Sequence, residues 1–243
     1  GQLEDNYFQS SVIDFDKDRS DRSTYKLLGG SIGFYGSTLN TRQYATKGYL
    51  EKLIAQVFTG RERFEPGNPQ EGYSPSPQER QSWLQISYMK EAYHTMGPKF
   101  TLGWMAEALY SSKNFSENYT ATMMQAGEFA PTPHSKLMYN EAFRANQYVA
   151  AGIKPIYVLN DMFQFRTEFY GFTPIFPIKK NALNKAYYGK AFSRFEYMGE
   201  VSVICHLPFG AISAYVNHYS SPRREWNVGM TIGWQLFNYR FVE

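Results

Sequence analysis

One motif in the sequence is of the kind that carries a catalytic nucleophile. Gly29-Gly30-Ser31-Ile32-Gly33 matches the Gly-x-Ser-x-Gly pattern of hydrolases, in which the serine sits on a strained turn between a strand and a helix. Here the alternation of residue types continues through Ile32, Phe34 and Gly36, which predicts an uninterrupted strand. We therefore expect no catalytic residue in this chain.

The metal-binding residue types are sparse. The four histidines, His94, His134, His206 and His218, lack the spacing of a metal site, and turn or interface roles fit them better. The one cysteine, Cys205, has no second thiol for an internal disulfide or a metal cluster. We expect no metal and no cofactor.

The composition is unusual for an ordinary soluble domain. Aromatic residues make up 18% of the 243 residues, while the mean hydropathy is a polar −0.49. Such a chain needs a fold that presents aromatic side chains on one face and polar groups on the other. The net charge is only +3 and the basic residues are dispersed, which argues against nucleic acid as a partner.

No uninterrupted stretch of about 18 apolar residues exists in the sequence, which excludes a transmembrane helix. A membrane location stays open, because strands that alternate between lipid and lumen carry a much weaker hydropathy signal.

Alternation with a period of two residues is the main pattern, and it is clearest over 161–171. Phe163, Phe165, Thr167 and Phe169 fall on one face, and Gln164, Arg166, Glu168 and Tyr170 fall on the other. The first face suits lipid and the second a wet, charged lumen. The alternating segments are long enough for strands that cross a bilayer in about 9–11 residues.

The pattern predicts nine strands, at 25–37, 48–62, 79–94, 99–111, 147–159, 161–173, 190–206, 209–219 and 226–241. Their connections alternate in length, with long loops at 63–78, 112–146 and 174–189. Short periplasmic turns and long external loops are typical of outer-membrane barrels. Within the second loop, 116–128 is open to a short helix or an extra strand, and we expect it to stay part of the loop.

Two segments resemble a known family. The polar run 37–48 entering a strand resembles the strand-turn-strand signature of the bacterial surface-antigen (BamA-like) barrel superfamily, with Ala45 in place of the usual proline. Segments 129–136 and 140–148 are similar to a loop of the barrels carried by patatin-like phospholipases of Bacteroidota. In the wider superfamily this loop folds into the barrel and ends in a Val-Arg-Gly-aromatic motif, and 143–145 would fill that place.

The resemblance implies an all-β, antiparallel transmembrane barrel in the bacterial outer membrane, with 25–243 as the last nine strands of a sixteen-stranded barrel. Residues 1–24 would be an N-terminal loop or the remnant of a preceding strand. Nine strands leave an open edge, which is costly in lipid. We therefore expect the other strands, and a patatin lipase domain, to come from the same gene or from another chain.

Arg144, in the loop 112–146, is a candidate for holding that loop inside the barrel through an ion pair. A guanidinium on a loop that enters a barrel needs a carboxylate partner, and the inward face is expected to supply Glu168, Glu196 and Glu200. The alternative is that Arg144 lies in solvent on an external loop.

Aromatic residues near predicted strand ends suggest interfacial girdles: Trp83, Tyr110, Tyr157, Tyr170, Trp226 and Tyr239. Packing in a soluble core is the competing explanation. Phe241, near the end of the sequence, is a candidate for the C-terminal aromatic residue that acts as an assembly signal in many outer-membrane barrels.

Three functions follow as expectations. In the first the barrel anchors or displays a patatin-like lipase domain at the cell envelope, with outer-membrane lipid as its main partner, and is not itself catalytic. In the second it is a BamA-like insertase or translocation barrel. In the third it is a structural or porin-like barrel, or a soluble β-protein with an aromatic core.

Overall fold

A computed structural model describes residues 1–9, 18–68, 80–208, 210–221 and 226–234. The chain folds into one long antiparallel sheet of ten strands in the order β1-β2-β3-β4-β5-β8-β9-β12-β13-β14. Each strand therefore pairs with its neighbour in sequence along this sheet. The nearly all-β, antiparallel character predicted from alternation is confirmed.

The sheet strands are β1 (Gln2–Tyr7), β2 (Asp21–Ser37), β3 (Gly48–Glu65), β4 (Arg80–Thr95), β5 (Phe100–Ser111), β8 (Gln147–Val158), β9 (Phe163–Pro174), β12 (Glu196–Leu207), β13 (Gly210–Tyr219) and β14 (Trp226–Trp234). Nine of them correspond to the nine predicted segments, of which the last can be compared only over 226–234 because 235–241 lie outside the described residues. Two differences stand out. The strand expected from residue 190 begins at Glu196, because Phe192 has a left-handed φ of 52° and interrupts the extended chain. Residues 1–24 contain an additional short strand, β1.

The strands are staggered in the way that a curved, barrel-like sheet requires. Glu51, near the lower end of β3, pairs with Lys90, and Lys90 pairs with Ala106 of β5. The same row continues through Ala151 and Gly171 and reaches Tyr197 near the upper end of β12. The row climbs because every strand is tilted in the same sense.

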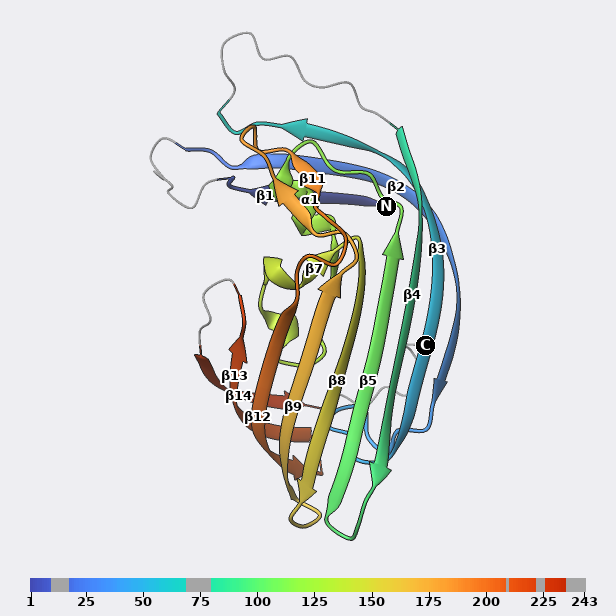
Figure 1. Ribbon diagram of the computed structural model, residues 1–243, viewed down its shortest axis with the longest axis vertical. Coiled ribbons are helices and arrows are strands. Elements are labelled where there is room, and N and C mark those ends of the chain that lie inside the picture. Colours follow the sequence, from blue (N-terminus) through green and yellow to red (C-terminus); the bar gives the residue numbers. More distant parts are fainter. Residues whose placement is uncertain (10–17, 69–79, 209, 222–225, 235–243) are drawn as a thin grey trace.

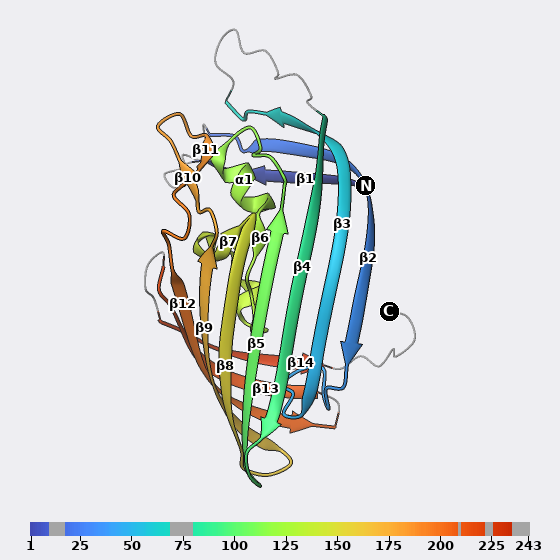
Figure 2. The ribbon, with the colours of Figure 1, turned by 45° about the vertical axis from the view of Figure 1, so that its right-hand side comes forward.

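The sheet curls into a deep trough whose edges do not pair. In Figure 2, β13 and β14 pass behind the lower halves of β8, β5 and β4. The edge strands are β1 and β14, and β1 covers only the upper part of β2, over 21–26. Among the described residues the sheet is open, because no pairing joins its two edge strands.

The long connections leave the sheet at its upper end and the short turns lie at its lower end (Figure 1). The loop between β5 and β8 holds helix α1 (Tyr119–Gln125), two single-turn 3₁₀ helices, and the two-stranded pair β6 (Gly127–Glu128) and β7 (Arg144–Ala145). These elements lie on the concave side of the sheet (Figures 1 and 2). The segment 116–128 stays part of this loop, as expected, and within it forms a helix and a short strand that does not join the main sheet. The loop between β9 and β12 holds the hairpin β10 (Ile178–Lys180) and β11 (Ala186–Tyr188).

The two faces of the sheet differ in polarity. Along β9, Phe163, Phe165 and Phe169 are exposed on the convex face, whereas Gln164, Arg166 and Glu168 are buried on the concave face. The predicted alternation over 161–171 is confirmed. Ser31 lies in the middle of β2, so the Gly-x-Ser-x-Gly motif is a strand, as predicted, and not a hydrolase turn.

Candidate functional site: the charged concave face and its plug

The wall of the trough carries buried charges that are paired with one another. The Arg166 Nε donates to Glu168 Oε1 at 2.8 Å, and the Tyr170 hydroxyl donates to the other oxygen of Glu168 at 2.6 Å. Lys154 Nζ donates to Glu91 Oε1 at 2.9 Å. Arg166, Glu168 and Lys154 are each at most 5% exposed. Buried charges are tolerated only when paired and hydrogen-bonded, so this face is built to be polar yet closed to bulk water.

The turn between β2 and β3 folds up into the trough from below. The carbonyl of Ala45 accepts from Arg166 Nη1 at 3.0 Å, and the carbonyl of Tyr44 accepts from the Gln164 side-chain amide at 3.1 Å. Tyr44 has a left-handed φ of 56°, a conformation that a bulky residue adopts only when its surroundings enforce it. The lower end of the trough is therefore blocked by residues 38–47.

The loop 112–146 fills the trough from above. Phe129 and Phe143 are each 2% exposed and pack against Phe172 of β9, with ring centroids 5.9 and 5.6 Å apart. Tyr148 closes the same cluster, and its hydroxyl donates to Glu107 Oε1 at 2.6 Å. Burial of such aromatic side chains stabilises a fold by several kcal/mol each, so the loop is a fixed plug.

The two plugging segments meet at a buried polar cluster formed by His134, Glu200, Ser213 and Tyr44. His134 Nδ1 lies 2.8 Å from Glu200 Oε1, and its Nε2 lies 3.1 Å from Ser213 Oγ. The Tyr44 hydroxyl donates to Ser213 Oγ at 2.9 Å. The cluster ties the upper loop and the lower turn to strands β12 and β13.

The order of contacts in this cluster, serine to histidine to carboxylate, is that of a hydrolase relay. Its surroundings differ from those of an active site. Ser213 is 1% exposed and His134 is 1% exposed, and the imidazole is stacked on the Tyr215 ring at 3.5 Å. Because Ser213 Oγ is occupied by Tyr44 and closed to solvent, the arrangement acts as a lock between segments.

Arg144 has a different partner from the three predicted. It pairs with Glu128 at 2.6 Å, and its Nη1 donates to the carbonyls of Met123 and Met124 at 3.2 and 2.9 Å. The β6–β7 pairing sets Glu128 directly opposite Arg144, so this carboxylate is the nearest one. The guanidinium caps the last carbonyls of α1, where positive charge is favourable.

The three predicted carboxylates lie on the concave face as expected, but each has its own partner. Glu168 is bound by Arg166 and Tyr170, as described above. Glu200 is bound by His134 and by the Thr132 hydroxyl at 3.1 Å. Glu196 accepts from Ser220 Oγ at 2.5 Å. The pairing predicted for Arg144 is therefore wrong, and His134 makes the contact to the wall.

The predicted girdle aromatics divide between the two faces. Tyr110, Tyr157 and Trp226 are exposed, at 46%, 44% and 71%. Trp83 and Tyr170 are buried on the concave face, at 8% and 3%, so their assignment to a membrane interface is wrong; both point inward because of their parity along β4 and β9. Tyr239 and Phe241 lie outside the described residues.

Lys113, directly after β5, is a buried cation that no pattern in the sequence indicates. Its Nζ lies 5.1 Å from the ring centroids of both Tyr25 and Trp83 and donates to Gln125 Oε1 at 3.3 Å. Burial lowers the pKa of Lys113 to about 8, although Glu62 and Asp5 act in the opposite direction. Alternation along β5 could not predict that Lys113 is buried, because β5 ends at Ser111 and residue 113 lies beyond it.

Within the part of the chain that the structure describes, no three His, Cys, Asp or Glu side chains gather in a way that would hold a metal ion. Of the described helices, none has the length and apolar character needed to cross a membrane. No family model, curated protein or solved structure matches this chain.

Proposed function

We propose that this chain forms the lipid-facing wall of an outer-membrane β-barrel and serves as an anchor, without catalytic residues of its own. The observation that carries the proposal is the inverted polarity of the sheet. Ile153, Phe169 and Val57 are 52%, 55% and 61% exposed on the convex face, whereas Arg166 and Glu168 are 3% and 5% exposed on the concave face. A face of exposed apolar side chains this extensive is unfavourable in water and favourable in lipid.

The height of the apolar face supports this proposal. On β3 the outward residues between Glu51 and Arg61 are Leu53, Ala55, Val57 and Thr59. The ten residue-to-residue steps from Glu51 to Arg61 span about 33 Å along the strand, and the roughly 35–45° tilt of outer-membrane strands reduces this to about 25 Å, the height of their apolar band.

The plugged trough favours an anchor over a porin-like channel. A porin needs a water-filled lumen, whereas here His134, Phe129 and Tyr44 fill the concave face from both ends. The likeness of 129–148 to the loop of patatin-linked barrels supports a lipase domain as the group that is anchored or displayed. The open edges, at β14 and at β1 with the part of β2 that β1 does not cover, favour, as the second candidate, a BamA-like insertase in which such an edge receives strands of other proteins.

Fluorescence quenching by brominated phospholipids tests the membrane proposal. Two variants of the intact protein each keep one of the four tryptophans and carry phenylalanine at the other three. Trp104 lies on the convex face, in register with Ile153, and we expect strong quenching. Trp83 is buried on the concave face beneath Lys113 and serves as the matched control. Equal, weak quenching of both would refute a lipid-facing wall.

The coding sequence that precedes Gly1 distinguishes the two roles. A Gly-x-Ser-x-Gly turn followed by an Asp-Gly partner would mark a lipase domain, and phospholipase activity of the whole gene product should then depend on that serine. POTRA repeats in its place would favour the insertase.

A further inference from the structure

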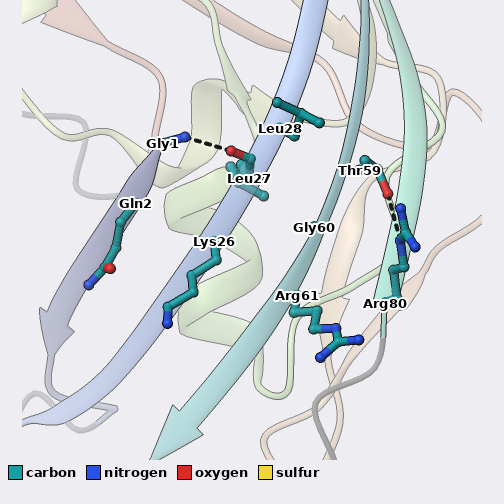
Figure 3. A pocket seen from close by; sticks show the side chains of 9 residues that line it. All are labelled: Gly1, Gln2, Lys26, Leu27, Leu28, Thr59, Gly60, Arg61 and Arg80. Carbon is teal, nitrogen blue, oxygen red and sulfur yellow. Dashed lines mark hydrogen bonds between the residues drawn. The ribbon is translucent and has the colours of Figure 1, made fainter.

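Three cations lie side by side on the convex face, at the upper ends of β2, β3 and β4. Lys26 is directly opposite Arg61, and Arg61 is directly opposite Arg80 (Figure 3). All three side chains are exposed. Like charges that face each other across neighbouring strands destabilise a sheet, so this cation row needs a counter-charge.

The described part of the protein does not supply that counter-charge. Glu62, next to Arg61 in sequence, faces inward and accepts from the Tyr25 hydroxyl. On the outward face, Glu65 is engaged by Arg22 and by Arg63, whose Nη2 lies 2.7 Å away, and Glu4 lies 3.8 Å from Arg22. Among the described residues no carboxylate lies within 4.0 Å of the charged groups of the cation row. Arg80 donates through Nε to Thr59 Oγ1 at 3.1 Å, and its two terminal amino groups form no salt bridge with a carboxylate of the described residues.

The position of the cation row in the wall indicates what would neutralise it. Two residues further down each strand lie Leu28, Thr59 and Ser82, and the next outward positions on β3 and β4 are Val57 and Leu84. Leu28 is 73% exposed and lies about 7 Å below the row along the strand. The cations thus stand directly above the apolar band, at the level where the headgroups of a surrounding lipid leaflet begin.

The surface between these residues is hollowed. A shallow groove of about 450 Å³ is lined by the cation row together with Leu27, Leu28 and Thr59, and Figure 3 shows these side chains around it. The groove combines the charged groups of the cation row on one side with the exposed Leu28 on the other. That combination matches an amphiphile with an anionic head and an acyl chain.

We propose that the cation row binds the phosphate headgroup of an anionic lipid in the adjoining leaflet, with Leu28 against the first part of its acyl chain. The two guanidinium groups can each hold phosphate oxygens through paired N–H donors, and Lys26 adds a point charge. This inference rests on the proposed membrane location, and it adds a lipid class that the wall selects.

The test measures lipid retention by native mass spectrometry after reconstitution of the intact protein with diphosphorylated lipid A. The triple variant Lys26→Gln/Arg61→Gln/Arg80→Gln should lose at least tenfold of the retained lipid. The matched control Lys179→Gln/Lys180→Gln/Lys185→Gln removes the same charge from the exposed loop around β10 and β11 and should retain lipid like the parent. Retention by the triple variant equal to that of the parent overturns the proposal.

A second measurement does not depend on the variant. Lipid A should raise the Tm of the parent protein by several degrees, whereas its dephosphorylated form and millimolar inorganic phosphate should not. Equal stabilisation by inorganic phosphate alone would overturn the lipid assignment. In a non-ionic detergent the triple variant should melt at or above the Tm of the parent, because repulsion within the row is relieved; a lower Tm would indicate a structural role instead.

The quenching experiment keeps the two proposals separate. If Trp104 is quenched while lipid retention is unchanged in the triple variant, the membrane wall stands and the lipid site is refuted. If Trp104 is not quenched, the wall itself is refuted and the lipid site falls with it.

Discussion

An arginine placed in the middle of the convex face should discriminate a lipid-facing wall from a water-facing one. Ile153 is 52% exposed near the centre of β8. Its cross-strand neighbours are Trp104 and Phe169, both on the same outward face. Val149 is 44% exposed on the same face of the same strand, close to its upper end. The two positions are about 13 Å apart along the strand.

The expected magnitudes follow from depth. An arginine at the bilayer midplane on the lipid face of a barrel costs about 2–4 kcal/mol, and the cost falls to about 0–1 kcal/mol near the interface. Ile153→Arg should therefore destabilise the protein by roughly 2–3 kcal/mol more than Val149→Arg. If this face contacted water, both exposed substitutions should change the stability by no more than about 0.5 kcal/mol.

The assay is urea-induced unfolding of the intact protein in phospholipid vesicles, followed by tryptophan fluorescence and by the shift in gel migration between heated and unheated samples. The same pair of variants in a short-chain detergent serves as a control for folding. Free energies of unfolding that are equal for the two variants, and close to that of the parent, would refute the assignment of the convex face to lipid.

Three further predictions concern the plug and the residues around it. His134→Ala leaves Glu200 buried without its main partner and should lower the free energy of unfolding by about 3 kcal/mol, whereas Ser213→Ala should cost only about 1 kcal/mol; equal urea midpoints for His134→Ala and the parent would contradict the lock. Phe129→Ala removes the ring at the centre of the aromatic cluster and should lower the free energy of unfolding by about 3–5 kcal/mol. Limited proteolysis should then cleave loop 112–146 faster than in the parent. Leu137, in the same loop, is 77% exposed, so Leu137→Ala should leave the cleavage rate unchanged and serves as the control. Burial lowers the pKa of Lys113 in the folded protein to about 8, against an ordinary value of 10.5. Between these pH values the unfolded state binds more protons, so the free energy of unfolding rises with pH. This rise should be smaller in Lys113→Met, and identical pH profiles of the two proteins would contradict the buried amine.

Much of the fold was accessible from the sequence because alternation is a local property. Side chains of a strand point to opposite faces with a period of two residues, so the sequence alone predicted that Phe165 faces out and that Arg166 and Glu168 face in. The same pattern predicted nine of the ten strands of the sheet and the sorting of long and short connections. It also showed that Ser31 belongs to a strand.

The contacts between distant segments were decided only by the tertiary structure. His134 and Glu200 are 66 residues apart in sequence, and Tyr44 and Ser213 are 169 residues apart. Their meeting depends on how the loop and the turn enter the trough. Arg144 illustrates the same limit, because the short β6–β7 pairing, and not the supply of inward carboxylates, selects Glu128 as its partner.

Strand register is the second property that the sequence by itself left undetermined. Lys26, Arg61 and Arg80 are separate outward positions in the sequence, and only the pairing of β2, β3 and β4 sets them in one row. Period-two alternation constrains which face a side chain occupies, but register is decided by the packing of both faces and by the geometry of the turns. The polarity of each face is therefore a property of the sequence, whereas the lock and the cation row are properties of the folded sheet.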